Sequence, residues 1–143
     1  MKKVTAILDR KQSHFKTVSP LLTIRDALNK MNCENTDHLI VMDDDENFLG
    51  IITEHDIMSK SLSAKIPNSE MQVSQIMNTH FPVAFIEDSV QTCMQSMQQY
   101  HVRILPVFDG HVFKGVVTAD DILYEAVWNH NEIFDEEKEI IAY

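Results

Sequence analysis

The sequence predicts an α/β fold made of two β-α-β-β-α repeats, each with a small three-stranded sheet, arranged about a pseudo-twofold axis and flanked by terminal helices. The first observation is a phrase, Gly-apolar-apolar-Thr-x-x-Asp, that occurs at residues 50–56 and again at 115–121. The second is that the apolar pattern ahead of each phrase also repeats, at an offset of 66 residues that becomes 65 within a predicted turn. The third is size, because 143 residues with 44% hydrophobic content suffice for a sizeable core.

The first repeat begins with a short extended piece at residues 16–18. Thr23 is then the expected cap of an amphipathic helix over residues 24–31, where apolar side chains recur at spacings of 3, 4 and 7. Two strands follow at residues 39–42 and 48–52, and a second helix begins at Thr53.

The second repeat has the same order. It has an extended piece at residues 82–85, a helix after Ser89, strands at 104–108 and 112–117, and a helix that begins at Thr118. The change of offset falls where a hairpin turn is expected in both copies, and turns absorb changes of length readily. The change therefore supports the alignment of the repeats.

The remaining segments complete the predicted organisation. Val4, Ile7 and Leu8 predict a short docking helix within residues 1–15. The repeats then occupy residues 16–62 and 73–130, with a linker at 63–72 that contains Pro67 and a helical turn expected at 73–77. Residues 131–143 are expected to form an acidic C-terminal helix.

Composition excludes several classes of function. The net charge of −10 and the scattered basic residues argue against nucleic-acid binding and against an anionic membrane surface. No apolar run approaches the roughly 20 residues that span a bilayer, and the N-terminus is a poor signal peptide. Two cysteines make neither a disulfide framework nor a zinc cluster, so a reducing cytoplasm is expected.

Catalysis and metal binding find little support. The seven histidines show no zinc-ligand spacing, and the acidic run at residues 43–46 lacks the spacing of a calcium loop. Three glycines in total preclude most phosphate-binding or nucleophile loops. We therefore expect no catalytic residues, no metal and no required cofactor.

The repeated phrase has a chemistry of its own. A strand that ends at Thr and turns into a helix places the hydroxyl, the free backbone N–H groups and the Asp carboxylate at one rim. A carboxylate can accept hydrogen bonds from both vicinal hydroxyls of a ribose, and a helix N-terminus suits a phosphate. The same Thr-x-x-Asp spacing is also close to a capping box, in which Thr and Asp serve the helix alone.

Several segments together resemble a known family. They are the two phrases, the helix at 24–31, the segment 76–79 and the stretch 97–109, which contains Arg103 and Pro106. Over nearly its whole length the chain resembles a tandem pair of CBS domains, the Bateman module, and it looks like the stand-alone bacterial type.

The resemblance implies two pockets for an adenosine ligand such as AMP, ADP, ATP or S-adenosylmethionine. Thr53 with Asp56 marks one pocket, and Thr118 with Asp121 marks the other, in contact with ribose and phosphates. Apolar residues of neighbouring strands are expected to sandwich the base; they are Val18, Phe81, Val83 and Pro106.

The sequence departs from the family pattern in ways that bear on the ligand. His55 and Ser59 stand where relatives often carry an arginine that meets phosphates, and Asp120 adds a negative charge. Arg103 is the best candidate to face a phosphate, with Lys60 behind it. We therefore expect AMP or an adenosyl group rather than a triphosphate, bound more tightly in the second pocket, which has Arg103 and Pro106.

These expectations describe a sensor rather than an enzyme. The ligand would bias a conformational equilibrium by binding one state better than another. A homodimer is expected, together with a regulated protein partner in trans. The alternative is a constitutive dimeric scaffold that binds no ligand, in which the Thr and Asp residues are caps.

Overall fold

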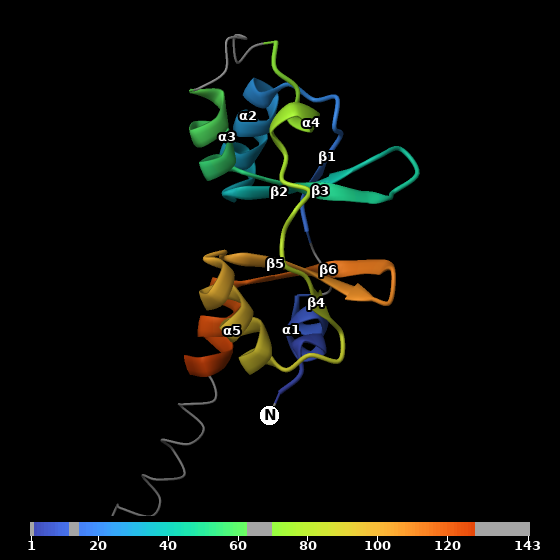
Figure 1. The fold of residues 1–143 in the computed structure, drawn as a ribbon, viewed down its shortest axis with the longest axis vertical. Coiled ribbons are helices and arrows are strands. Elements are labelled where there is room, and N and C mark those ends of the chain that lie inside the picture. Colours follow the sequence, from blue (N-terminus) through green and yellow to red (C-terminus); the bar gives the residue numbers. More distant parts are fainter. Residues whose placement is uncertain (1, 12–14, 63–69, 128–143) are drawn as a thin grey trace, which may run out of the picture. The chain divides into compact units, whose positions relative to one another are not determined.

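The computed structural model describes residues 2–11, 15–62 and 70–127. These form two compact units: a first-repeat unit within residues 15–81, and a second-repeat unit that joins residues 2–11 to 82–127. In each unit the helices lie on one face of a three-stranded sheet (Figure 1). The predicted α/β architecture with two small sheets is confirmed.

The first-repeat unit contains a sheet of order β1-β2-β3. Strand β1 pairs with β2 in parallel, and β2 pairs with β3 antiparallel. The elements in chain order are β1 (Thr17–Val18), α2 (Ile24–Glu34), β2 (His38–Met42), β3 (Phe48–Thr53), α3 (Glu54–Ser61) and α4 (Val73–Ile76).

The second-repeat unit repeats this plan with the sheet β4-β5-β6. Its elements are α1 (Val4–Arg10), β4 (Ala84–Phe85), α5 (Val90–Tyr100), β5 (Ile104–Asp109) and β6 (Val112–Thr118). Residues 119–127 form a further helix directly after β6. The register repeats as well, because Gly50 pairs with Val41 and Gly115 pairs with Val107, each next to an irregularity in the ladder.

Local capping explains where the long helices begin and end. The hydroxyl of Thr23 accepts a hydrogen bond from Asp26 N at 3.2 Å, and Ser89 accepts one from Thr92 N at 3.0 Å. Both helices end in a left-handed residue, Asn35 in α2 and His101 in α5. The caps at Thr23 and Ser89 are those the sequence predicts, although both helices run beyond the predicted apolar stretch.

Each unit has its own apolar core beneath its helices. The core of the first-repeat unit is built from Val18, Ile24, Ala27, Met31, Leu39, Val41, Ile52, Ile57, Met71, Val73 and Ile76. The core of the second-repeat unit is built from Val4, Ile7, Leu8, Ala84, Cys93, Met97, Leu105, Val107, Val117 and Ile122. Most of these residues occupy the apolar positions of the repeated pattern.

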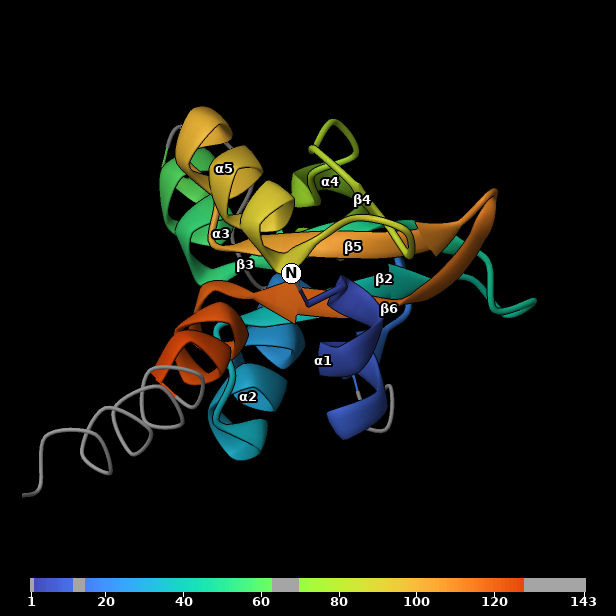
Figure 2. The ribbon, with the colours of Figure 1, turned by 90° about the horizontal axis from the view of Figure 1, so that it is seen from below.

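The compact units and the sequence repeats do not contain the same short helices. Helix α1 lies against β6 in the second-repeat unit (Figure 2), whereas α4 buries Val73 and Ile76 in the core of the first-repeat unit. Asn78 and Ile51 then exchange two backbone hydrogen bonds of 2.8 and 3.1 Å. Residues 73–81 therefore pack with the repeat that precedes them. The predicted C-terminal helix at 131–143 lies outside the described residues, as do residues 63–69 of the linker.

Candidate functional site

The first Thr/Asp turn, residues 53–56, joins strand β3 to helix α3. Thr53 is the N-cap of α3, and its hydroxyl accepts a hydrogen bond from Asp56 N at 3.0 Å. The backbone N–H of Glu54 donates to Asp37 O at 3.0 Å, which ties the turn to the start of β2. Within the described ranges, the half-buried Asp56 carboxylate has no hydrogen-bond or ion-pair partner.

The second Thr/Asp turn, residues 118–121, joins β6 to the helix at 119–127. The Thr118 hydroxyl accepts from Asp121 N at 3.1 Å, and Asp121 Oδ2 accepts from Thr118 N at 2.9 Å. This reciprocal pair is a full capping box. The capping alternative that the sequence left open is therefore satisfied structurally at this turn, whether or not a ligand also binds.

Asp121 has a further partner that sequence reasoning missed. Lys11, at the end of α1, places its ammonium 2.8 Å from Asp121 Oδ2 and 3.1 Å from the carbonyl oxygen of Val116. The two side chains of the ion pair are 21% and 17% exposed. No local pattern signals this contact, because Lys11 lies 110 residues before Asp121 in the chain.

The apolar residues nominated to hold a base have different environments. Val18 is 6% exposed and belongs to the core, so its side chain packs inside the first-repeat unit. Phe81 is half-buried and packs edge-to-face with Phe48, at 5.4 Å between ring centroids. In the second-repeat unit, Pro106 is buried in β5 opposite Val116, whereas Val83 is 37% exposed.

Arg103, nominated to face a phosphate, and His55, which stands where relatives often carry an arginine, are both exposed. The Arg103 side chain is 74% exposed and lies 3.5 Å from Asp120, while its carbonyl accepts from Ala119 N beside the second turn. His55 is exposed on the first turn of α3. The structure thus brings Arg103 to the Thr118 turn and leaves the Thr53 turn with His55.

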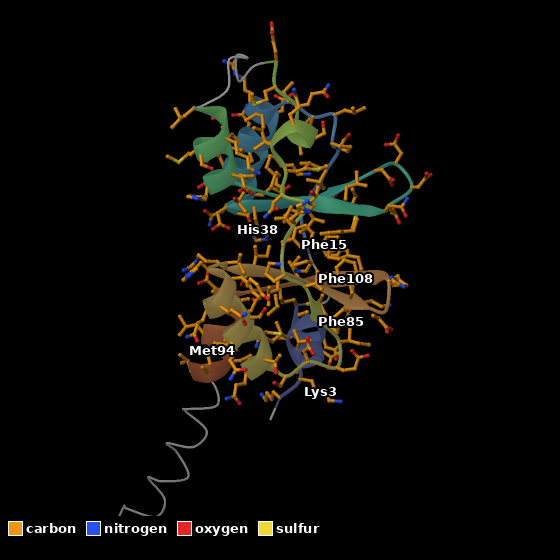
Figure 3. All side chains as sticks on the ribbon, in the orientation of Figure 1. Lys3, Phe15, His38, Phe85, Met94 and Phe108 are labelled. Atoms are coloured by element: carbon orange, nitrogen blue, oxygen red, sulfur yellow. The ribbon has the colours of Figure 1, made fainter. Side chains whose placement is uncertain are left out.

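A second residue that the sequence analysis did not nominate lies beside the first turn. His38 begins β2 directly opposite Thr53 in the sheet, and its side chain lies on the face of the sheet away from the helices (Figure 3). The imidazole Nδ1 is 3.0 Å from Asp37 Oδ1 and 3.4 Å from the Thr36 hydroxyl. The repeat offset aligns His38 with Ile104, and Ile104 pairs with Thr118 as His38 pairs with Thr53. This alignment could have identified His38 from the sequence.

Neither a metal centre nor a membrane span emerges from the described residues. No group of three or more His, Cys, Asp or Glu side chains there is arranged to hold a metal ion. No helix in the described part of the chain is both long and apolar enough to cross a bilayer.

The geometry and the repeat together agree with one family. The model of the CBS domain matches this chain twice, at residues 7–63 and 73–127, and each match ends with one Thr/Asp turn and the helix that follows it. The chain belongs to the CBS-domain family. As a CBS pair it resembles the crystal structure of the CBS-domain protein NE2398, with a TM-score of 0.83 and 30% identity, over 89% of this chain and 99% of the other.

Curated relatives share the CBS pair in different contexts. The uncharacterised protein YlbB of Bacillus subtilis is 30% identical over 121 residues, which cover 83% of this chain and 80% of YlbB. A homoserine O-acetyltransferase of Methanococcus vannielii is 32% identical over 110 residues, 76% of this chain. The match spans 22% of that enzyme, so the shared part is a CBS pair within a much longer protein.

Proposed function

We propose that this CBS pair is a regulatory module that binds an adenosine-containing ligand and carries out no catalysis. The observation that carries the proposal is the half-buried Asp56 carboxylate, which follows a capped helix start and has no partner among the described residues. Two oxygens on a fixed carboxylate can accept both hydroxyls of a ribose. The capping bond from Asp56 N to the Thr53 hydroxyl fixes the backbone that carries this carboxylate.

Charge around the first turn supports a ligand with few negative charges. Glu54 and Asp56 lie on the first turn of α3, and Lys60 on the same helix donates to the carbonyl of Ile76 at 2.9 Å. A triphosphate would face these carboxylates without a dedicated arginine clamp. AMP, or the cationic S-adenosylmethionine, therefore fits this environment better than ATP.

The proposed output is a shift of a conformational equilibrium. A ligand that binds one state of the module better than another changes the populations by its differential affinity. A protein partner that reads the favoured state would act in trans.

Calorimetric titration tests the proposal. AMP, ADP, ATP and S-adenosylmethionine are titrated into the wild-type chain and into Asp56→Ala. We expect micromolar binding of AMP or S-adenosylmethionine, and a loss of that binding in Asp56→Ala with the fold retained by circular dichroism. A wild-type chain that binds none of the four ligands would favour the scaffold alternative, in which both turns only cap helices.

A further inference from the structure

The two Thr/Asp turns are chemically unequal, and the difference resides at Lys11. Asp121 Oδ2 accepts hydrogen bonds from Thr118 N at 2.9 Å and from Lys11 Nζ at 2.8 Å. A carboxylate oxygen offers about two lone-pair positions. Oδ2 is therefore saturated, and a ribose that needs both carboxylate oxygens must first displace the ammonium.

The position of Lys11 is fixed by more than this ion pair. Its ammonium also donates to Val116 O at 3.1 Å, and its backbone N–H closes the last turn of α1 by donating to Ile7 O at 3.0 Å. Helix α1 is itself anchored, because Val4, Ile7 and Leu8 belong to the core of the second-repeat unit. Displacing the ammonium therefore breaks two hydrogen bonds, and one of them belongs to an ion pair that is largely shielded from water.

Among the residues that the structure describes, no lysine or arginine pairs with Asp56 as Lys11 pairs with Asp121. The repeat pairs Val116 with Ile51, and the carbonyl of Ile51 accepts from the backbone N–H of Asn78 at 2.8 Å instead of from a side chain. Aligning α4 with α1 places His80 at the position of Lys11, and His80 is exposed, with its backbone N–H donating to Asn78 Oδ1. The carbonyl is thus satisfied without a cation, and Asp56 is left unpaired within the described ranges.

We infer that Lys11 closes the second Thr/Asp turn to a ribose, so that each chain binds one adenosine ligand, at the first turn. This inference rests on the proposed function and adds to it the site that is used and the residue that decides it. The Lys11 ammonium competes with the ligand for Asp121: it pairs with the carboxylate and occupies the place of one ribose hydroxyl. The positive charge of Arg103 nearby does not make up for the occupied Asp121 carboxylate, because the Arg103 side chain is 74% exposed and lies beside Asp120.

The test counts ligands per chain. S-adenosylmethionine and AMP are titrated calorimetrically into the wild type, Lys11→Met, Lys11→Arg and the control Lys114→Met, which removes an exposed charge from β6 of the same unit. We expect one site per chain in the wild type, in Lys11→Arg and in Lys114→Met, and two sites in Lys11→Met. Asp121→Ala in the Lys11→Met background should return the count to one.

Several outcomes would overturn the inference while leaving the proposed function standing. The first is a wild-type chain with two sites, one of which is lost in Asp121→Ala. The second is a folded Lys11→Met chain with only one site. Absence of binding in both the wild type and Lys11→Met would overturn the proposed function itself. If Lys11→Met does not fold, Asp121→Ala in the wild-type chain decides: unchanged binding supports the inference, and loss of a site contradicts it.

Discussion

At the scale of single residues, two aspartates with the same place in the repeat have different surroundings. Asp56 has an unpaired carboxylate within the described ranges, whereas Asp121 completes a capping box and an ion pair with Lys11. The phrase Gly-apolar-apolar-Thr-x-x-Asp is sufficient to predict the strand end and the cap in both copies. It cannot predict the ion pair, because the partner lies on a helix that precedes the repeats. The family resemblance led us to expect tighter binding at the second turn, whereas the site proposed above is the first turn, where the Asp56 carboxylate is unpaired among the described residues.

The thiols give a prediction at this scale. Burial raises the pKa of the Cys93 thiol to about 11, with a contribution from the nearby Asp88 carboxylate, whereas Cys33 is exposed. The thiolate is the reactive form, so iodoacetamide at pH 8 should label Cys33 and leave Cys93 unmodified in the folded chain. Peptide mass spectrometry with and without denaturant measures both sites. Equal labelling of the two cysteines in the folded chain would contradict the burial of Cys93.

The same thiol predicts a dependence of stability on pH. Its folded pKa lies above the ordinary value of 9.0, so folding favours the neutral thiol. This contribution is present in full below about pH 9 and is lost as the pH rises through about 11. Urea midpoints measured from pH 8 to 11 should fall for the wild type, and should fall less for Cys93→Ala.

Gly50 gives a prediction about close backbone packing. A Cβ at this position would lie 2.7 Å from the carbonyl oxygen of Asn78, which belongs to the backbone and cannot rotate away. Gly50→Ala should therefore cost roughly 2–3 kcal/mol of unfolding free energy, as overpacking in a core does. The control is Gly110→Asn, at a turn with φ of +59° and no atom within 4 Å, where asparagine is tolerated. Similar urea midpoints for the two variants would contradict the close approach.

At the scale of elements, the helices and strands of both repeats follow from periodicity and caps. The strands β2, β3, β5 and β6 and the helices α2 and α5 lie where apolar spacing and the caps Thr23 and Ser89 predict them. What periodicity cannot predict is which sheet a short helix joins. Four-residue α4 and seven-residue α1 each bury only two or three apolar residues, and this spacing does not specify a sheet. Their choice depends on contacts distant in sequence, such as the Asn78–Ile51 bridge.

Ion pairs hold helix α1 in the second-repeat unit, and they predict how much Arg10 contributes to stability. Glu125 is 5% exposed and is the one buried charged residue of the described ranges; it pairs with Arg10 and with Lys2. The Arg10 guanidinium also stacks over the ring of Tyr124, 4.4 Å from its centroid. Arg10→Ala leaves a buried carboxylate short of a donor and should cost about 1–3 kcal/mol in chemical denaturation.

The matched control for Arg10 is Arg103→Ala in the same unit. Arg103 pairs with Asp120 at 3.5 Å, but both side chains are largely exposed, so its loss should change stability by well under 1 kcal/mol. Arg10→Ala should also make the position of the next residue, Lys11, less fixed. Equal stability of the two variants would show that the Glu125 cluster does not anchor α1.

At the scale of the whole molecule, apolar side chains remain exposed on helices of both units. They include Met58 on α3 and Leu62 directly after it in the first-repeat unit, and Met94, Tyr100, Leu123, Tyr124 and Val127 in the second. Clusters of exposed large apolar residues are typical of interaction surfaces. We therefore expect a homodimer, with a light-scattering mass of twice the 16.5 kDa of one chain. Leu62→Glu and Leu123→Glu should shift that mass toward the monomer, and a wild-type monomer at tens of micromolar would contradict the expectation.

The most direct test of the central claim compares ribose with deoxyribose. AMP and its 2′-deoxy counterpart are titrated into the wild type and into Asp56→Ala. If Asp56 holds the two vicinal hydroxyls, removing one should weaken binding about tenfold or more in the wild type, as expected for a lost hydrogen bond to a charged group. The two ligands should then bind Asp56→Ala alike. Equal affinity of the wild type for both ligands would contradict the claim.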